Sequence, residues 1–425
     1  MSPGSNFKYI PTLTRELKDS PNSFYFNYLL NQFMATGRSR DFDGSQTWLT
    51  VCLSREQEHP ASVLATEALA KAYFGRLQGY QDVVNNGSRT YSQALLALCE
   101  NLKDPQKSLS YDTLAASAVL TFYEYLVFTT KQGWVMHSQG VARLIEMRGP
   151  ERFLEFPYRA ILNTHRQILI IQALASRKRT FLEQARWIEV AWPEPTGRPP
   201  IVRVHDIFAR LPGMTEDILR MEDDPSVSAG FVLVTQRKID KIVDELRVLE
   251  LDMLVDDSRM AEEESTSAAS PTNPFATEVK YPSLVAASLW TSFDAIMILA
   301  LEWQYKSRHP EWQKGTNHEG CELVPETRQY ALHICKSVEY LLQPQWMHSG
   351  AFYLIFPTRV AFMALPVASP EALWIVGILE RMATDSDFEM ARNVLTNVQI
   401  NEKEGGMNGA KASHAPSLLA SSHGA

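Results

Sequence analysis

The spacing of apolar residues constrains this chain most, because it separates helices from strands. Apolar side chains recur at intervals of three and four residues along the sequence and seldom alternate, which is the helical period. After Asp112, for example, Leu114, Ala118, Phe122 and Leu126 fall on one helical face, and the Asp112 side chain is placed to cap that helix. The pattern predicts an all-α fold, a large multi-helix domain for which a division into two helical halves is one arrangement.

The composition indicates a globular protein with no charge-driven attraction to nucleic acid or membrane. The chain has 425 residues, of which 45% are hydrophobic, so it can bury a sizeable core. Its 41 basic and 49 acidic residues give a formal net charge of -8, which provides no overall positive field. The first residues lack a secretory pattern, and no apolar run stands out as long enough for a membrane span. We therefore expect a soluble intracellular protein without a membrane segment.

Changes of composition along the chain predict its segments. From Trp192 to Pro200 the sequence holds four prolines and one glycine, which favours an extended crossing between helical parts. From Asp256 to Thr277 it is too polar to offset the entropy of ordering by burial. We predict a flexible N-terminus at 1–22, an N-terminal helical half at 23–190, a Pro-rich crossing at 191–200, a helical segment at 201–255, a disordered acidic and Ser-rich loop at 256–280, a C-terminal helical half at 281–400 and a disordered tail at 401–425.

Two further helix starts carry a capping pattern. Thr215 precedes two acidic residues, which predicts a cap and an acidic first turn. Ser369 precedes Pro370 and Glu371, which predicts a cap with proline at the first helical position.

The sequence lacks the signatures of metal and cofactor sites. A structural zinc site needs four thiolate or imidazole ligands, usually in closely spaced cysteine pairs. His333 and Cys335 are two residues apart on a predicted helix and point to different faces, so we do not expect zinc there. No phosphate-binding glycine loop, metalloprotease motif or hydrolase serine elbow is present, which predicts no cofactor and no enzyme activity. We interpret the cysteines as reduced packing residues: Cys52, Cys99, Cys321 and Cys335.

Three titratable residues lie inside apolar helical patterns. His137 and His165 are candidates for a catalytic base, because histidine titrates near neutral pH, but we interpret them as hydrogen-bonded core residues. Glu124 stands between two tyrosines. It is either a buried acid with a raised pKa or the acceptor that holds the following loop, and we favour the second interpretation.

The run Arg177, Lys178 and Arg179 is the most compact basic cluster. It is a candidate nuclear-localisation signal or phosphate contact. It is also what a solvated helix end looks like, where cations suit the helix dipole, and we favour that interpretation.

The order of several motifs resembles the fungal-specific transcription factor domain. From Tyr91 the chain reads YSQALLALCENL, then YDTLAASAVLTFYEYL, then WVMHSQGVARLIEMRGPERF. The similarity continues from Ala173 to Trp187 and resumes between Gly350 and Trp374. In that family this domain is the large regulatory region of zinc-cluster transcription factors. The residues that match its pattern, and that we interpret as structural, are Tyr123, Glu124, Trp134, His137, Gly140, Arg148, Gly149, Pro150 and Trp187.

Some of these residues suggest a local role. Trp134 and His137 share a helical face, which predicts a core residue with a polar partner. Gly140 would let a neighbouring helix approach closely. Gly149, followed by Pro150, predicts a helix end in which glycine takes a left-handed conformation.

The resemblance implies a nuclear regulator of transcription, one that controls a metabolic gene set such as secondary metabolism. It implies action through homo- or heterodimers, the transcription machinery or a small-molecule effector. Family members carry six cysteines that bind two zinc ions before this domain, whereas the first cysteine here is Cys52. DNA contact is therefore expected only indirectly or through an upstream module. The alternatives are a biosynthetic enzyme on a recruited scaffold, with Glu124, His137 and His165 as acid-base candidates, or an adaptor that sequesters a full-length regulator.

Overall fold

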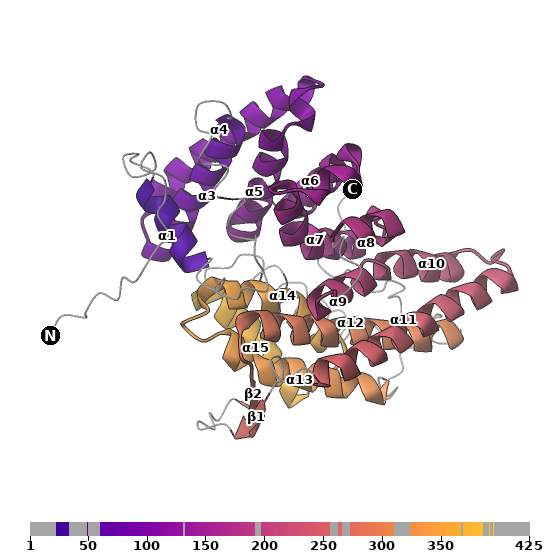
Figure 1. Ribbon diagram of the computed structural model, residues 1–425. Coiled ribbons are helices and arrows are strands. Elements are labelled where there is room, and N and C mark those ends of the chain that lie inside the picture. Colours follow the sequence, from indigo (N-terminus) through magenta and orange to yellow (C-terminus); the bar gives the residue numbers. More distant parts are fainter. Residues whose placement is uncertain are drawn as a thin grey trace.

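The computed structural model describes residues 23–33, 49, 60–130, 132–191, 197–255, 262–265, 273–309, 324–366, 369–385, 391 and 394, and it confirms the all-α prediction (Figure 1). The predictions for 1–22 and 401–425, and for Cys52 and Cys321, lie outside the described residues. The helices are α1 (Ser23–Phe33), α3 (Pro60–Gln78), α4 (Gln81–Lys103), α5 (Tyr111–Val127), α6 (Gly133–Arg148), α7 (Tyr158–Ala175), α8 (Ala185–Ala191), α9 (Pro200–Phe208), α10 (Leu211–Asp223), α11 (Ala229–Val255), α12 (Leu284–Arg308), α13 (Pro325–Leu341), α14 (Met347–Met363) and α15 (Pro370–Asp385).

We call α1 and α3 to α8 the N-terminal part and α9 to α15 the C-terminal part. Helix α5 is the centre of the N-terminal part. It packs between α3 and α6, and its residues from Tyr111 to Leu126 are all buried. The cap differs from the prediction: the Ser110 hydroxyl accepts from the Thr113 N–H, two positions earlier than expected. Asp112 instead lies in the first turn, where its carboxylate accepts from the Ser62 N–H at 2.8 Å and from the Asn101 side chain at 2.8 Å. The aspartate therefore joins α5 to α3 and α4 rather than capping its own helix.

Helix α12 is the corresponding centre of the C-terminal part, with α11, α13 and α14 packed around it (Figure 1). The absence of a span-length apolar run was a wrong prediction, because α12 is long and apolar enough to cross a membrane. However, 94% of the apolar stretch is buried inside the protein, and this identifies α12 as a core helix.

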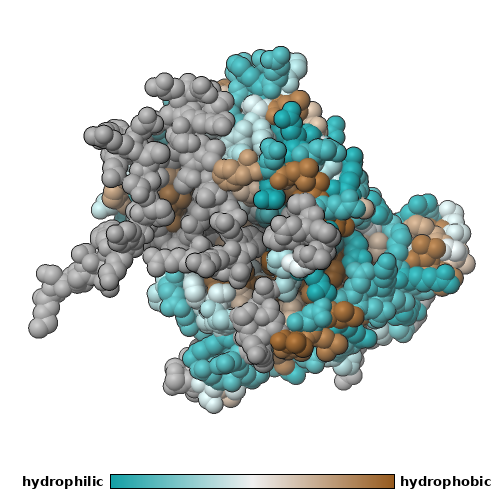
Figure 2. Space-filling model, in the orientation of Figure 1, coloured by the Kyte–Doolittle hydropathy of each residue, from teal (hydrophilic) through white to brown (hydrophobic). Residues whose placement is uncertain are grey.

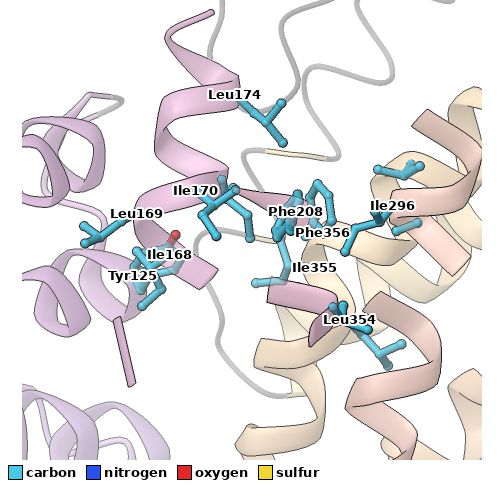
Figure 3. Packing of buried hydrophobic residues seen from close by; sticks show 14 of the residues in the cluster. Tyr125, Ile168, Leu169, Ile170, Leu174, Phe208, Ile296, Leu354, Ile355 and Phe356 are labelled. Atoms are coloured by element: carbon cyan, nitrogen blue, oxygen red, sulfur yellow. The ribbon is translucent and has the colours of Figure 1, made fainter. Parts of the chain in front are cut away.

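The two parts share a continuous apolar core (Figure 3). On α7, Ile170 lies on the side of Phe208 of α9 and of α14, whereas Ile168 lies beside Tyr125 of α5. The ring of Phe208 packs on that of Phe356, with centroids 5.2 Å apart. A second connection is polar, because the buried Arg166 guanidinium of α7 donates to Asp206 of α9, which also binds Arg198 at 3.0 Å. The surface is mixed, with separate hydrophobic patches on a largely hydrophilic face (Figure 2).

The predicted disordered loop at 256–280 contains two strands in its described residues. Strand β1 (Glu262–Ser265) pairs antiparallel with β2 (Thr277–Lys280), with Glu263 opposite Val279. Two ion pairs explain why an acidic run can be ordered: Glu264 binds Lys280 at 2.6 Å and Glu263 binds Lys336 of α13 at 2.6 Å. Val279 is buried and anchors the hairpin, so charge neutralisation and one apolar contact replace the disorder expected from composition.

Three smaller predictions have different outcomes. Thr215 does not cap a helix, because α10 begins at Leu211 with a proline in its first turn and Thr215 lies inside it. Ser369 does cap α15, since its hydroxyl accepts from the Ala372 N–H at 3.2 Å. Cys335 is a buried packing residue as expected, whereas Cys99 is exposed on α4.

Two histidines are buried in this core. His165 of α7 has Nδ1 3.0 Å from the Ile161 carbonyl oxygen and Nε2 3.1 Å from that of Ala118 on α5. Burial lowers the pKa of His165 to about 4, against the effect of the two carbonyls. Burial also lowers the pKa of His205, to about 3, and the nearby Arg166 contributes. Both imidazoles are therefore neutral in the folded protein at pH 7.

We predict that the stability of the protein falls as the pH decreases from 6.5 toward 4. In that window the unfolded histidines take up protons that the folded ones do not, so each contributes a loss of about 1.4 kcal/mol per pH unit. Urea unfolding at several pH values measures this slope. In His165→Gln the dependence of the unfolding free energy on pH should decrease by about 1.4 kcal/mol per pH unit, which corresponds to one proton. An unchanged slope would contradict the assignment of His165 as a buried neutral residue.

Candidate functional site

A buried carboxylate joins three helices in the N-terminal part of the chain. Glu124 lies in the last turn of α5 and is 0% exposed. The Tyr91 hydroxyl of α4 donates to Oε1 at 2.6 Å. In the loop after α5, the N–H of Thr129 donates to Oε2 at 3.0 Å and its hydroxyl to Oε1 at 2.7 Å. Nε2 of His137 on α6 lies 3.0 Å from the Tyr91 oxygen. We call these four residues the Glu124 cluster.

The proton positions in the cluster follow from the donors available. A tyrosine hydroxyl has one proton, and that of Tyr91 points to Glu124. The Tyr91 oxygen therefore accepts from His137, whose Nε2 carries the proton of the neutral ring. The carboxylate receives three hydrogen bonds and the phenol takes part in two, which satisfies the polar groups that are buried there.

Gly133, the first residue of α6, sets how closely that helix approaches the carboxylate. A Cβ atom at this position would stand 2.3 Å from Oε2 of Glu124 and 3.2 Å from Oγ1 of Thr130. Only glycine leaves room for the helix N-terminus beside Glu124. This placement also puts the acidic side chain at the positive end of the α6 dipole, which favours it.

Aromatic stacking fixes the Tyr91 ring. It lies on the ring of Tyr123, with centroids 4.2 Å apart and planes inclined by 17°. The Tyr123 hydroxyl in turn donates to the Ser88 side chain of α4 at 3.4 Å. Two consecutive residues of α5 therefore fix Tyr91: the Glu124 carboxylate accepts from its hydroxyl, and the Tyr123 ring stacks on its face.

The electrostatics of the cluster favour neutral groups around one acceptor. Burial, together with Glu124, raises the pKa of Tyr91 above its ordinary value. Burial lowers the pKa of His137, and Glu124 opposes this effect. At neutral pH the phenol keeps its proton and the imidazole is uncharged. Among the described residues, no group of three metal-binding side chains is close enough to hold an ion. The arrangement supports a hydrogen-bonded junction between α4, α5 and α6.

Arg148 forms a second junction at the other end of α6. Its guanidinium donates to the carbonyl oxygens of Leu144 at 2.6 Å, Ser108 at 2.9 Å and Ser110 at 2.7 Å. It therefore ties the end of α6 to the start of α5. Gly149 follows with φ +72° and ψ 157°, a positive φ that favours glycine but differs from the left-handed helical conformation that was predicted, and the short helix that starts at Pro150 continues the chain.

The remaining pattern residues lie in the core, with one exception. Trp134 is buried against Tyr125, with ring centroids 5.5 Å apart. Trp187 of α8 is buried against Phe181, at 4.8 Å. Gly140 contradicts the prediction of a close helix approach, because it is exposed and a Cβ atom there would meet nothing within 4 Å. The close approach in α6 is at Gly133 instead.

The basic run is partly engaged in ion pairs. Arg179 binds the carboxylates of Glu183 at 2.9 Å and Asp217 at 2.8 Å, and Nε lies 3.5 Å from that of Glu216. It therefore links the loop after α7 to α10. The run lies beyond the last turn of α7, so these ion pairs replace the solvated helix end that the sequence suggested. Lys178 is exposed, and the localisation signal stays a prediction.

A second titratable pair lies in the C-terminal part, outside the sequence-predicted residues. Nδ1 of His333 is 2.6 Å from the buried Asp294 carboxylate of α12. Asp294 raises the pKa of His333 against the effect of burial, and burial raises the pKa of Asp294. The sequence suggested only Cys335, on the same helix, as a neighbour of His333. The partner in the structure is Asp294 of the neighbouring helix α12.

Sequence analysis missed Tyr91, Thr129 and Gly133 as members of the site. Tyr91 and Gly133 border the motifs that carried the family resemblance, so their position was a usable signal. Thr129 had none, because a loop residue that binds an acid five positions earlier has no characteristic spacing. Of the three acid-base candidates, the structure brings Glu124 and His137 together through Tyr91. His165 faces backbone carbonyls elsewhere.

Comparison with known proteins places the Glu124 cluster inside a recognised domain. Residues 22–187 match the family described as the fungal specific transcription factor domain. This range is less than half of the chain, and over it the chain is similar to that family. Its matched range includes α1 and α3 to α7, both junctions and Trp187. The similarity noted between Gly350 and Trp374 lies outside this range and stays a prediction.

One curated relative is similar to the domain. It is an uncharacterized protein of Emericella nidulans, 28% identical over 179 residues. The alignment covers 42% of this chain and 38% of the relative, so the chain spans well under half of that protein in the match. No solved structure matches the chain.

We predict opposite effects for two glycine substitutions in α6. Gly133→Ala should destabilise the protein by about 1 to 3 kcal/mol, because its methyl group overlaps the Glu124 carboxylate. Gly140→Ala should stabilise it by about 0.5 to 1 kcal/mol, since alanine suits an exposed helix position with free space. Urea unfolding measures both. Equal effects of the two substitutions would mean that Gly133 does not set the approach of α6.

Proposed function

We propose that this chain is a transcriptional regulator or co-regulator that acts in the fungal nucleus. The observation that carries the proposal is the family match over residues 22–187. The helices of that range are joined by the Glu124 cluster and by Arg148, which supports a regulatory domain that moves as a unit. The proposed action is through dimerisation, effector sensing or contact with the transcription machinery. DNA contact is then indirect or supplied by another module.

We also propose that the chain is not an enzyme. The support is the state of the three acid-base candidates. Glu124 is sealed from solvent and accepts from Tyr91 and Thr129. His137 holds a hydrogen bond to the Tyr91 hydroxyl, and His165 is buried between two carbonyls. Glu124 and His137 are engaged in hydrogen bonds, and the single N–H of a neutral His165 donates to one of its two carbonyls, which agrees with a structural role.

The regulatory proposal predicts an effect on transcription when the chain is brought to a promoter. We expect residues 1–425, fused to a heterologous DNA-binding module, to change reporter expression in a fungal host relative to the module alone. The Gly140→Ala fusion should keep this effect and the Gly133→Ala fusion should weaken it, because only the second disturbs the Glu124 cluster.

Two controls accompany the reporter measurement: an immunoblot gives the amount of each fusion protein, and microscopy gives its location in the cell. Reporter expression equal to that of the module alone, from a fusion that is abundant and nuclear, would contradict the proposal. Retained effect in Gly140→Ala with loss in Gly133→Ala supports it and connects regulation to the folded domain.

A further inference from the structure

Arg359 is a buried arginine for which the described residues provide no counterion. Arg359 lies in α14 and is 2% exposed. Within the part of the chain that the structure describes, its Nη2 has no hydrogen-bond partner and its guanidinium forms no ion pair. Burial lowers the pKa of Arg359 to about 10, with no nearby carboxylate to offset this effect. Desolvating a cation without compensation is costly, so such a group needs a partner.

The other buried arginines show what a compensated guanidinium looks like in this fold. Arg166 is equally buried and donates to the Asp206 carboxylate. Arg148 donates to three carbonyl oxygens. The fold therefore supplies acceptors where an arginine serves as a structural tie, and Arg359 is distinct from both.

The position of Arg359 is at the boundary between the two parts of the protein. On α14 it follows Phe352 and Phe356 by seven and three residues, so the three share a helical face. Phe356 packs on Phe208 of α9, and Phe352 packs on Tyr125 of α5 with centroids 5.5 Å apart. Figure 3 shows the Phe356 end of this face pressed toward α7 and α9. A ligand on this face would therefore contact elements of both parts.

An apolar cavity lies on the same face. Its volume is about 10 Å³, and its lining comes from α1, α3 and α5 together with Phe352 of α14. It is two helical turns from Arg359, or about 10 Å along the axis. In this form it has room for one water at most, so a larger occupant needs α14 to shift.

The sequence of α14 provides a point where such a shift costs little. Pro357 stands inside the helix, where it cannot donate to the carbonyl of Tyr353 and weakens the helix locally. The Thr358 hydroxyl bonds the Leu354 carbonyl at 2.7 Å, a contact that also favours bending. The other end of α14 is fixed, because Gly350 packs directly on the Leu341 carbonyl of α13. Pro357 lies between this fixed end and the turn that carries Arg359.

We propose that Arg359 binds the carboxylate of a small organic acid whose apolar part lies between α14 and the N-terminal helices. The guanidinium fork matches a carboxylate geometrically, and the apolar surroundings disfavour a doubly charged, strongly hydrated phosphate. This inference rests on the proposed regulatory function only in treating the acid as an effector. Because α14 joins both parts, binding there would change how they pack on each other.

The test compares thermal unfolding of the full chain with that of variants at pH 7.5 and constant ionic strength. The probes are hexanoate, hexanamide and inorganic phosphate. Without probe, Arg359→Met should unfold at the same or a higher temperature than the wild type, whereas Arg166→Met should unfold at a lower one. Hexanoate at ten times its Kd should raise the wild-type Tm by about 2 °C and leave that of Arg359→Met unchanged. Hexanamide should have no effect.

Several results would overturn the proposal. One is a loss of stability in Arg359→Met that equals that of Arg166→Met, or a failure of Arg359→Met to fold, since either shows a structural tie. Another is an equal effect of hexanoate on the wild type and Arg359→Met. A response to phosphate alone contradicts the carboxylate class. Calorimetric titration of the wild type with hexanoate and hexanamide decides binding independently of any variant. The readout involves no transcription, so a failure here leaves the reporter experiment intact.

Discussion

The N-terminal domain depends on the burial of one carboxylate. A carboxylate removed from water is stable only if donors replace the lost hydration, and Glu124 obtains them from a helix on one side and a loop on the other. This requirement fixes the distance between α4 and α5 and the path of the chain into α6. It also explains the glycine at the start of α6, because the carboxylate fills the space that a side chain would need.

The same rule orders the rest of the molecule. Buried charges at Arg148, Arg166 and Asp294 each meet an acceptor or donor from a different helix, so every one of them joins two elements. Arg359 departs from the rule at the boundary between the two parts of the chain. A structural explanation covers the first three. The fourth is better explained by a group that arrives from outside, and this links the fold to the proposed regulation.

Sequence reasoning could predict what depends on periodicity and local chemistry. The helix that follows Asp112 and the Ser369 cap follow from residues that are neighbours in the chain. Contacts between residues far apart in the sequence could not be predicted. Asp112 binds α3 instead of its own helix, and the acidic strand β1 is ordered by lysines that come later in the chain. Two of the four residues of the Glu124 cluster, Glu124 and His137, could be named from the sequence because they match the family pattern. Their connection through Tyr91 is a fact of packing.

The most direct test of this account is a double-mutant cycle on the Tyr91–Glu124 hydrogen bond. Tyr91→Phe removes the donor and Glu124→Gln removes the charge, and urea unfolding of both single variants and the double variant gives their coupling energy. If this bond holds the domain together, the two losses are not additive and the coupling is about 1 to 3 kcal/mol. Additive losses, equal to their sum within about 0.5 kcal/mol, would contradict the claim that this bond holds the domain together.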